Sequence, residues 1–159
     1  MEEQMNLHMA QQTYETVCRA LDVAGWKFDK NDEELSVDLL MQGENMPIRC
    51  LFRVDKERCV LGLYAFTPLT IPEDRRIHVC YAANLINWRI VDGCYDSSPL
   101  KEGLLFRVTQ SFRGCEISTV QVEYMTVIAC RTVDEYALRF QDLAEGKMEL
   151  ADFVKSLNQ

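Results

Sequence analysis

Helices packed on an antiparallel β-sheet, an α+β fold, are predicted by three features of the sequence. Apolar residues alternate with polar ones through residues 26–66, and the same two-residue period returns within residues 88–108. Before and after this region, apolar residues recur every three or four positions, as they do on one face of a helix. Short polar turns join the strand patterns, which favours antiparallel neighbours. The order of elements therefore predicts an antiparallel sheet with helices packed on it.

The composition is that of one folded domain. The chain has 159 residues, of which 48% are hydrophobic and 26% charged, close to the averages of globular proteins. A chain of this size buries roughly 68–70% of its unfolded surface, which is enough for a hydrophobic core. We therefore expect a single domain over residues 1–159, with residues 1–8 disordered and residues 147–159 forming a short C-terminal helix.

The charge balance argues against two classes of partner. Acidic residues outnumber basic ones by 25 to 17, a net charge of -8, and a negative field repels phosphate backbones and anionic lipids. No run approaches the roughly 18 apolar residues of a membrane span, and the first twelve residues lack the pattern of a signal peptide. We expect a cytoplasmic protein that binds neither nucleic acid nor membrane.

The first helix is predicted over residues 10–24. Tyr14, Val17 and Leu21 recur at helical spacing. Gly25 follows them, and glycine readily adopts the left-handed conformation that ends a helix.

Four strands are predicted next, at residues 26–28, 35–41, 48–54 and 59–66. The acidic segment 29–34 is predicted to be the turn between the first two. Within the fourth strand both alternating sets are apolar apart from Gly62, the pattern of a strand covered on both faces. We expect that strand to lie in the centre of the sheet or to be covered by a partner.

A second helix is predicted over residues 71–87. Thr70 and Glu73 have the spacing of a capping box, and Asn87 is expected to bond to free backbone groups at the helix end. Strand patterns return at residues 88–95 and 104–108. Gly93 interrupts the first of them, which predicts a bulge or a close backbone approach.

The remaining residues are predicted to be helical. One helix is expected around residues 120–128, and Thr132 with Glu135 repeats the capping-box spacing that would start another. Gly146 separates a short amphipathic segment that follows.

No pattern of reactive residues indicates catalysis, a metal or a cofactor. The seven cysteines are widely spaced, without a C-x-x-C pair, and are expected to be reduced thiols. His78 and Cys80 lie two apart on a predicted helix, where side chains point away from each other. The segment that starts at Asp29 does not match an EF-hand calcium loop. Glu34 stands where the loop needs glycine, and Leu40 stands where it needs glutamate. We expect a protein that is not an enzyme.

A mixed leucine and arginine surface is the candidate binding site. If Cys50 and Phe52 face the core, their neighbours face the opposite side of the sheet, and Leu105 and Arg107 have the same outward parity. Tyr64 joins them if the register allows. The candidate binding residues are therefore Arg49, Leu51, Arg53, Tyr64, Leu105 and Arg107.

Three explanations of this surface remain open. The C-terminal helices could cover it, with the arginines paired to Asp38 and neighbouring acids. A symmetric dimer could bury it, because a self-complementary apolar patch is the usual basis of two-fold association. A partner segment could also bind there, with the arginines selecting an acidic ligand.

The chain also resembles a known family. The resemblance rests on four segments within Thr13 to Gly146: Thr70–Arg76, Asn84–Trp88, Gly93–Asp96 and Gly103–Arg107. These segments resemble the YbjN-like proteins, bacterial proteins proposed to act as sensory transduction regulators. The resemblance implies a fold similar to type III secretion chaperones, with a twisted antiparallel sheet, and often a homodimer. It supplies no catalytic residues, and this chain departs from the pattern in its seven cysteines and its added C-terminal helix.

The sequence therefore predicts a non-catalytic binding or chaperone-like regulatory module with a protein or peptide partner, expected to form a homodimer and to act in sensory transduction regulation. One alternative is an enzyme acting on a small molecule, which would need a deep pocket around Cys94, Tyr95 or His78. The other is a purely structural homodimer.

Overall fold

The computed structural model describes residues 2–158, and the side chains of residues 4–158. Its helices are α1 (Glu2–Ala24), α2 (Arg76–Asn87), α3 (Thr119–Ala144) and α4 (Leu150–Ser156), with a 3₁₀ turn, η1 (Glu73–Arg75), before α2. Its strands are β1 (Asp29–Asn31), β2 (Ser36–Gln42), β3 (Pro47–Asp55), β4 (Val60–Phe66), β5 (Cys94–Ser97) and β6 (Leu104–Ser111). No helix among these residues is both long enough and apolar enough to span a bilayer.

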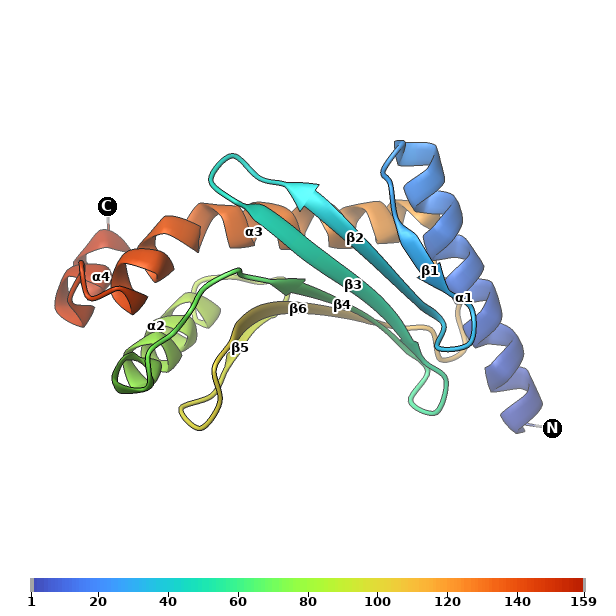
Figure 1. The fold of residues 1–159 in the computed structure, drawn as a ribbon. Helices are drawn as coiled ribbons and strands as arrows, with labels where there is room; N and C mark the ends of the chain where they lie inside the picture. The colour runs from blue at the N-terminus through green and yellow to red at the C-terminus, as the bar shows by residue number, and fades with distance from the viewer. Residues whose placement is uncertain (1, 159) are drawn as a thin grey trace.

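The six strands form one antiparallel sheet in the order β1-β2-β3-β4-β6-β5. The first four strands are neighbours in chain order. The chain then passes through α2, β5 forms the far edge of the sheet, and β6 lies between β5 and β4. Figure 1 shows the twisted sheet with α3 running across it, α1 at one end, and α2 and α4 at the other. The predicted α+β fold and antiparallel sheet are confirmed.

The hydrophobic core lies on one face of the sheet only. Alternate residues of β3 are buried on the side that faces α3, as the two-residue period of a strand requires. The 26-residue helix α3 buries one side along its length against them. Its core residues include Val122, Met125, Ala129, Val133, Tyr136, Ala137 and Phe140.

Strand β4 lies inside the sheet, between β3 and β6, so its predicted central position is confirmed. Leu61, Leu63 and Ala65 are buried in the core, whereas Tyr64 and Phe66 on the other face remain half-buried. The apolar residues of this second face are therefore not fully covered by the chain itself.

The N-terminal part of the chain differs from the prediction. Helix α1 begins at Glu2 rather than near residue 10, so residues 2–8 are helical instead of disordered. Glutamate, glutamine, methionine and leucine are strong helix formers, and they extend a helix without needing an apolar period. Strand β1 lies within the predicted turn and not at residues 26–28, because its position is set by pairing with β2, where Lys30 faces Val37.

The helix starts of the second half also need correction. Thr70 caps no helix: η1 starts after Pro72 without a side-chain cap, and α2 begins only at Arg76. Thr132 lies buried inside α3, which continues through the two predicted helices. A capping pattern has no effect there because the backbone donors are already bonded within the helix. The residues that do form a capping box are Ser118 and Gln121.

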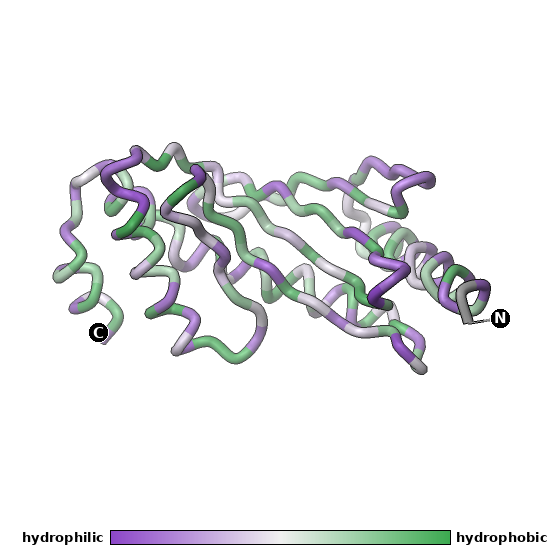
Figure 2. The backbone as a smooth tube through the Cα atoms, turned by 90° about the horizontal axis from the view of Figure 1, so that it is seen from below, coloured by the Kyte–Doolittle hydropathy of each residue, from purple (hydrophilic) through white to green (hydrophobic). Residues whose placement is uncertain are grey.

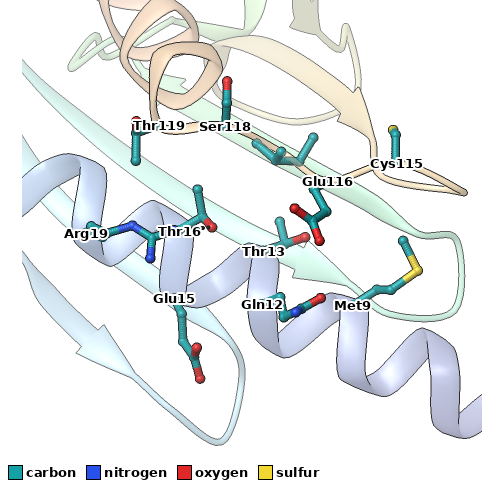
Figure 3. Close-up of a pocket in the computed structure, with 11 residues that line it drawn as sticks. Met9, Gln12, Thr13, Glu15, Thr16, Arg19, Cys115, Glu116, Ser118 and Thr119 are labelled. Atoms are coloured by element: carbon teal, nitrogen blue, oxygen red, sulfur yellow. Dashed lines mark hydrogen bonds between the residues drawn. The ribbon is translucent and has the colours of Figure 1, made fainter.

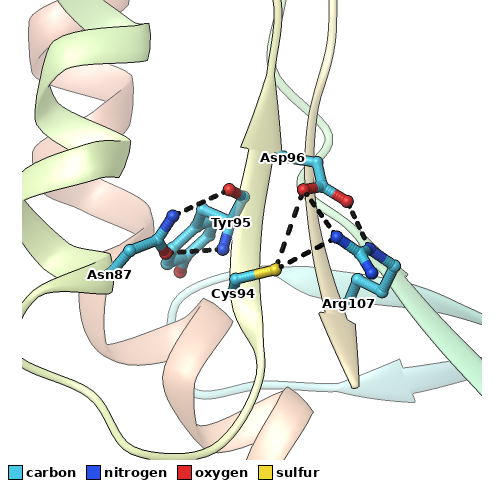
Figure 4. A network of polar contacts seen from close by, with 5 residues as sticks. All are labelled: Asn87, Cys94, Tyr95, Asp96 and Arg107. Carbon is cyan, nitrogen blue, oxygen red and sulfur yellow. Dashed lines mark hydrogen bonds and ion pairs between the residues drawn. The ribbon is translucent and has the colours of Figure 1, made fainter. Parts of the chain in front are cut away.

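Asn87 and Gly93 hold β5 in place. The Asn87 side chain accepts a hydrogen bond from the Tyr95 amide at 2.7 Å and donates one to the Tyr95 carbonyl at 3.0 Å (Figure 4). Asn87 thus binds a strand. The prediction that it bonds to the end of its own helix is wrong. Gly93 has a φ of 74°, and a Cβ atom there would lie 2.6 Å from the ring of Phe106, so the predicted close approach is confirmed. The strand predicted at residues 88–95 is confined to Cys94–Ser97 because the backbone bends at this glycine.

We predict that Asn87→Ala lowers the free energy of unfolding by about 1–3 kcal/mol, because the part-buried backbone groups of Tyr95 lose their side-chain partner. Urea denaturation measures the change, and hydrogen exchange at the Tyr95 amide locates it. Asn84→Ala, an exposed position on the same helix, is the control. Equal effects of the two substitutions would contradict this role.

Candidate functional site

The sheet face opposite α3 is uncovered, and we call it the open face. Figure 2 looks at the molecule from this side, with the strands in front and α3 behind them. Cross-strand pairing assigns residues to this face, because directly paired residues point to the same side. Its residues include Asp38, Leu40, Arg49, Leu51, Arg53, Gly62, Tyr64, Phe66, Cys94, Asp96, Leu105, Arg107 and Thr109.

All six predicted binding residues lie on the open face. One row across the sheet pairs Leu51 with Tyr64 and Tyr64 with Arg107. The next row pairs Arg49 with Phe66 and Phe66 with Leu105; Arg53 stands beside Gly62 in a third. The register thus settles the side on which Tyr64 lies. Binding by these six residues remains a prediction.

Each arginine of the open face has an acidic partner. Arg107 binds Asp96 through two hydrogen bonds, of 2.6 Å from Nε and 3.2 Å from Nη2. Arg49 also pairs with Asp38, whose Oδ2 accepts hydrogen bonds from both Nε and Nη2, with 3.0 Å between Nε and Oδ2. Arg53 lies 3.8 Å from Glu34. The hydrogen bond with Asp96 raises the pKa of Arg107 above its ordinary value.

These ion pairs bear on the three explanations of the surface. The arginines do pair with Asp38 and nearby acids, as one explanation expected, but no described helix covers the face. The local charge is close to neutral, because every positive group has a negative neighbour. An acidic ligand would therefore have to displace Asp38 or Asp96, which weakens the idea that the arginines select one.

Apolar side chains lie between the ion pairs. Leu51, Phe66 and Leu105 are half-buried, and Leu40 is 69% exposed at the β2 side. Arg49 stacks its guanidinium over the Phe66 ring, 5.5 Å from the ring centre. The surface thus combines half-buried apolar side chains with charges held in ion pairs.

Gly62 allows Tyr64 to lie flat on the sheet. A Cβ atom at position 62 would come within 2.9 Å of the Tyr64 ring and hydroxyl. The ring therefore covers the glycine backbone, which explains why Gly62 is buried although its strand neighbours on this face are not. The Tyr64 ring, lying over Gly62, is thus a flat aromatic surface beside Arg107.

A groove of about 960 Å³ lies on the open face at the α1 end of the sheet. Arg53, Tyr64 and Arg107 line it, together with the turns that follow β1 and β3. Leu7 and Gln11 of α1 form its outer wall. Leu7 was not predicted as a site residue, because residues 1–8 were expected to be disordered. Ala10 is the signal that could have indicated it, since it continues the buried spacing of Tyr14 and Val17 toward the N-terminus.

The thiol of Cys94 belongs to the Arg107–Asp96 network (Figure 4). Arg107 Nη2 lies 3.4 Å from the Cys94 sulfur, and the thiol lies 3.7 Å from Asp96 Oδ1. Burial raises the pKa of Cys94, and the negative charge of Asp96 raises it further. Its raised pKa keeps the thiol protonated at neutral pH, where it takes part in this hydrogen-bond network.

The groups considered for an enzyme do not converge on a common site. The Tyr95 hydroxyl donates to the Thr132 carbonyl at 3.1 Å inside the core, where burial raises the pKa of this tyrosine. Cys80 contacts Ser97 at 3.5 Å instead of His78. Within residues 4–158 no cluster of three histidine, cysteine or acidic side chains is arranged to hold a metal ion.

A second cavity, of about 420 Å³, lies between α1 and the segment before α3 (Figure 3). Its lining carries both charges, from Glu15, Arg19 and Glu116. Arg19 bonds to Thr16 of its own helix at 3.1 Å. The side chains do not converge on one point, so this cavity lacks the arrangement of a specific ligand site.

No family model and no curated protein matches the sequence. Solved structures with a similar fold include the following two. A chain of the ExsC–ExsE complex is 14% identical, with a TM-score of 0.60, over 80% of this chain and 92% of its own. YbjN from E. coli, proposed as a transcription regulator, is 11% identical, with a TM-score of 0.58, over 79% of this chain and 89% of its own.

This chain has the fold of YbjN and of a type III secretion chaperone. The resemblance and the fold class predicted from the sequence are therefore confirmed. At these identities the likeness concerns the fold alone.

We predict that Gly62→Ala displaces the Tyr64 ring without unfolding the chain. The added methyl group meets the far end of a side chain on an open surface, which can move away. NMR chemical shifts of the Tyr64 ring measure the displacement, and urea denaturation checks that stability stays within about 1 kcal/mol, as expected for a surface change. Unchanged Tyr64 shifts would contradict this packing.

Proposed function

We propose that this chain is a non-catalytic, chaperone-like or regulatory module that binds a protein partner on its open face. The observation that carries the proposal is a sheet face of partly exposed apolar side chains and paired charges that the chain leaves uncovered. Side chains fixed before binding lose little conformational entropy when a partner docks. Such a face is prepared for association.

The residue types support a protein partner. Arginine and tyrosine are enriched among the residues that carry most of the binding energy at interfaces. Tyr64, Arg107 and Leu51 lie side by side in the middle of the open face, where a docked surface would exclude water. The net charge of -8 disfavours nucleic acid. We infer a partner that presents apolar side chains, with polar groups for the ion pairs.

The structural neighbours support the same class of function. One of them belongs to a complex between two proteins, ExsC and ExsE. A role in sensory transduction regulation rests on the resemblance to YbjN. A location in the cytoplasm is our inference from the seven free cysteines.

A second copy of the chain is the other candidate occupant. The open face carries both charge signs, Arg49 with Asp38 and Arg107 with Asp96, so two copies related by a two-fold axis could exchange partners. Light scattering over a range of concentrations distinguishes the two cases. A stable mass of two chains favours the homodimer, and a monomer favours a different protein.

We predict that Leu51→Glu with Arg53→Glu abolishes association while the fold stays intact, because it places two negative charges in the middle of the open face. The control is Arg131→Glu with Leu138→Glu, which makes the same changes at exposed positions of α3. Quantitative affinity purification compares both variants with the wild type. If the folded open-face variant keeps the same associated proteins and the same solution mass, the proposal is wrong.

A further inference from the structure

Part of β6 is a free stretch of sheet edge. Strand β1 at one side is only three residues long and exposed, with two charged side chains, a common protection against strand pairing. At the other side, α2 packs on β5 and Asn87 bonds to its outer backbone groups. However, β5 pairs with residues 104–107 of β6 only. Residues 108–111 therefore have β4 on one side and no strand on the other.

The backbone of Thr109 points away from β4. The Phe112 amide donates to the Cys59 carbonyl at 2.9 Å, and the Thr67 amide donates to the Leu104 carbonyl at 3.1 Å. In an antiparallel ladder alternate residues bond to the same neighbour, so the even-numbered residues of β6 bond to β4. The amide and carbonyl of Thr109 then face the free side, where no described residue bonds to them.

A groove of about 590 Å³ runs along this free edge. Helix α3 forms one wall, with Val120 70% exposed and Tyr124 53% exposed. Val127 continues this stripe at helical spacing, and Val91, 95% exposed, stands at the opposite wall. The groove therefore combines unpaired strand groups with uncovered apolar side chains.

The path of the chain keeps this groove open. At Gly93, with a φ of 74°, the backbone turns away from β6, so β5 cannot continue past Cys94. Tyr124 then donates a hydrogen bond of 2.6 Å to Asp92, which holds the segment before β5 against α3. The space that a longer β5 would fill is left between them.

We propose that the free half of β6 binds an extended peptide segment of another protein as an added strand. The Thr109 amide and carbonyl would pair with the peptide backbone, and alternate apolar side chains of the peptide would pack on Val120 and Tyr124. The ladder would involve about four residues of β6, which matches the stretch left unpaired. This site adjoins the open face, with which it shares Arg107 and Thr109, but the proposal does not rest on the function of that face.

The geometry favours a peptide over a second copy. Tyr124 reaches from α3 to Asp92 beyond the edge of β6, so α3 extends under the position of an added strand. A second copy paired through its own β6 across a two-fold axis would bring its α3 to the same side of the joint sheet. The two helices would then compete for the same space, whereas a single extended segment would not.

A displayed library of random ten-residue peptides, selected against the full chain, tests the proposal. Enriched peptides are then titrated against Thr109→Pro and Thr109→Val. The proline removes the outward amide and places its ring in the groove, a substitution that edge strands tolerate. Valine keeps the backbone donor and is the matched control. We expect Thr109→Pro to weaken binding at least about tenfold and Thr109→Val to leave it unchanged, since one or two backbone bonds are lost.

Peptides that carry N-methyl groups on alternate amides give a second test, which does not depend on the folding of a variant. They should lose binding in one of the two methylation patterns, because only alternate amides of an added strand face β6. No enriched peptide, equal binding to Thr109→Pro, or indifference to methylation would each overturn the proposal. A wild-type dimer that Thr109→Pro converts to a monomer would overturn it in favour of a second copy. The Leu51→Glu, Arg53→Glu variant should still bind the peptides. A failure of this proposal can therefore be distinguished from a failure of the proposed function of the open face.

Discussion

The contact between α3 and the inner face of β3, β4 and β6 is the interaction on which the rest of the structure depends. A 26-residue helix is about 39 Å long, enough to cross all the central strands. Its buried side packs on these strands, whose residues Phe52, Leu63 and Phe106 have almost no exposed surface. The hairpin between β2 and β3 is tied to the same helix, where Asp134 accepts a hydrogen bond from the Asn45 amide at 2.9 Å.

One layer of helices can cover only one face of a sheet. Because strand residues alternate between the faces, burying Phe52 against α3 places Leu51 and Arg53 on the other side. The chain stabilises that side partly by ion pairing, as in the pair of Arg107 with Asp96, and partly by laying Tyr64 over Gly62. The same helix also extends past the edge of β6, where Tyr124 bonds to Asp92 beside the unpaired stretch of that strand.

The faces of the strands could be predicted from the sequence, because a two-residue period assigns sides without knowledge of the neighbours; Arg49 and Leu51 were placed correctly for this reason. Features that depend on strand order could not. The pairing of Asp96 with Arg107 and the unpaired stretch around Thr109 both arise because β6, not β5, lies next to β4. Helix α1 was predicted too short, since exposed helix formers give no apolar period.

The central claim is that the open face is accessible in the free chain. Hydroxyl-radical footprinting of the dilute protein, read by mass spectrometry, tests it most directly. We expect Tyr64 and Phe66 to be oxidised at rates between those of the exposed Tyr81 and the buried Tyr95. Rates for Tyr64 and Phe66 as low as that of Tyr95, in a sample that is monomeric by light scattering, would mean that the chain covers this face itself and would contradict the account.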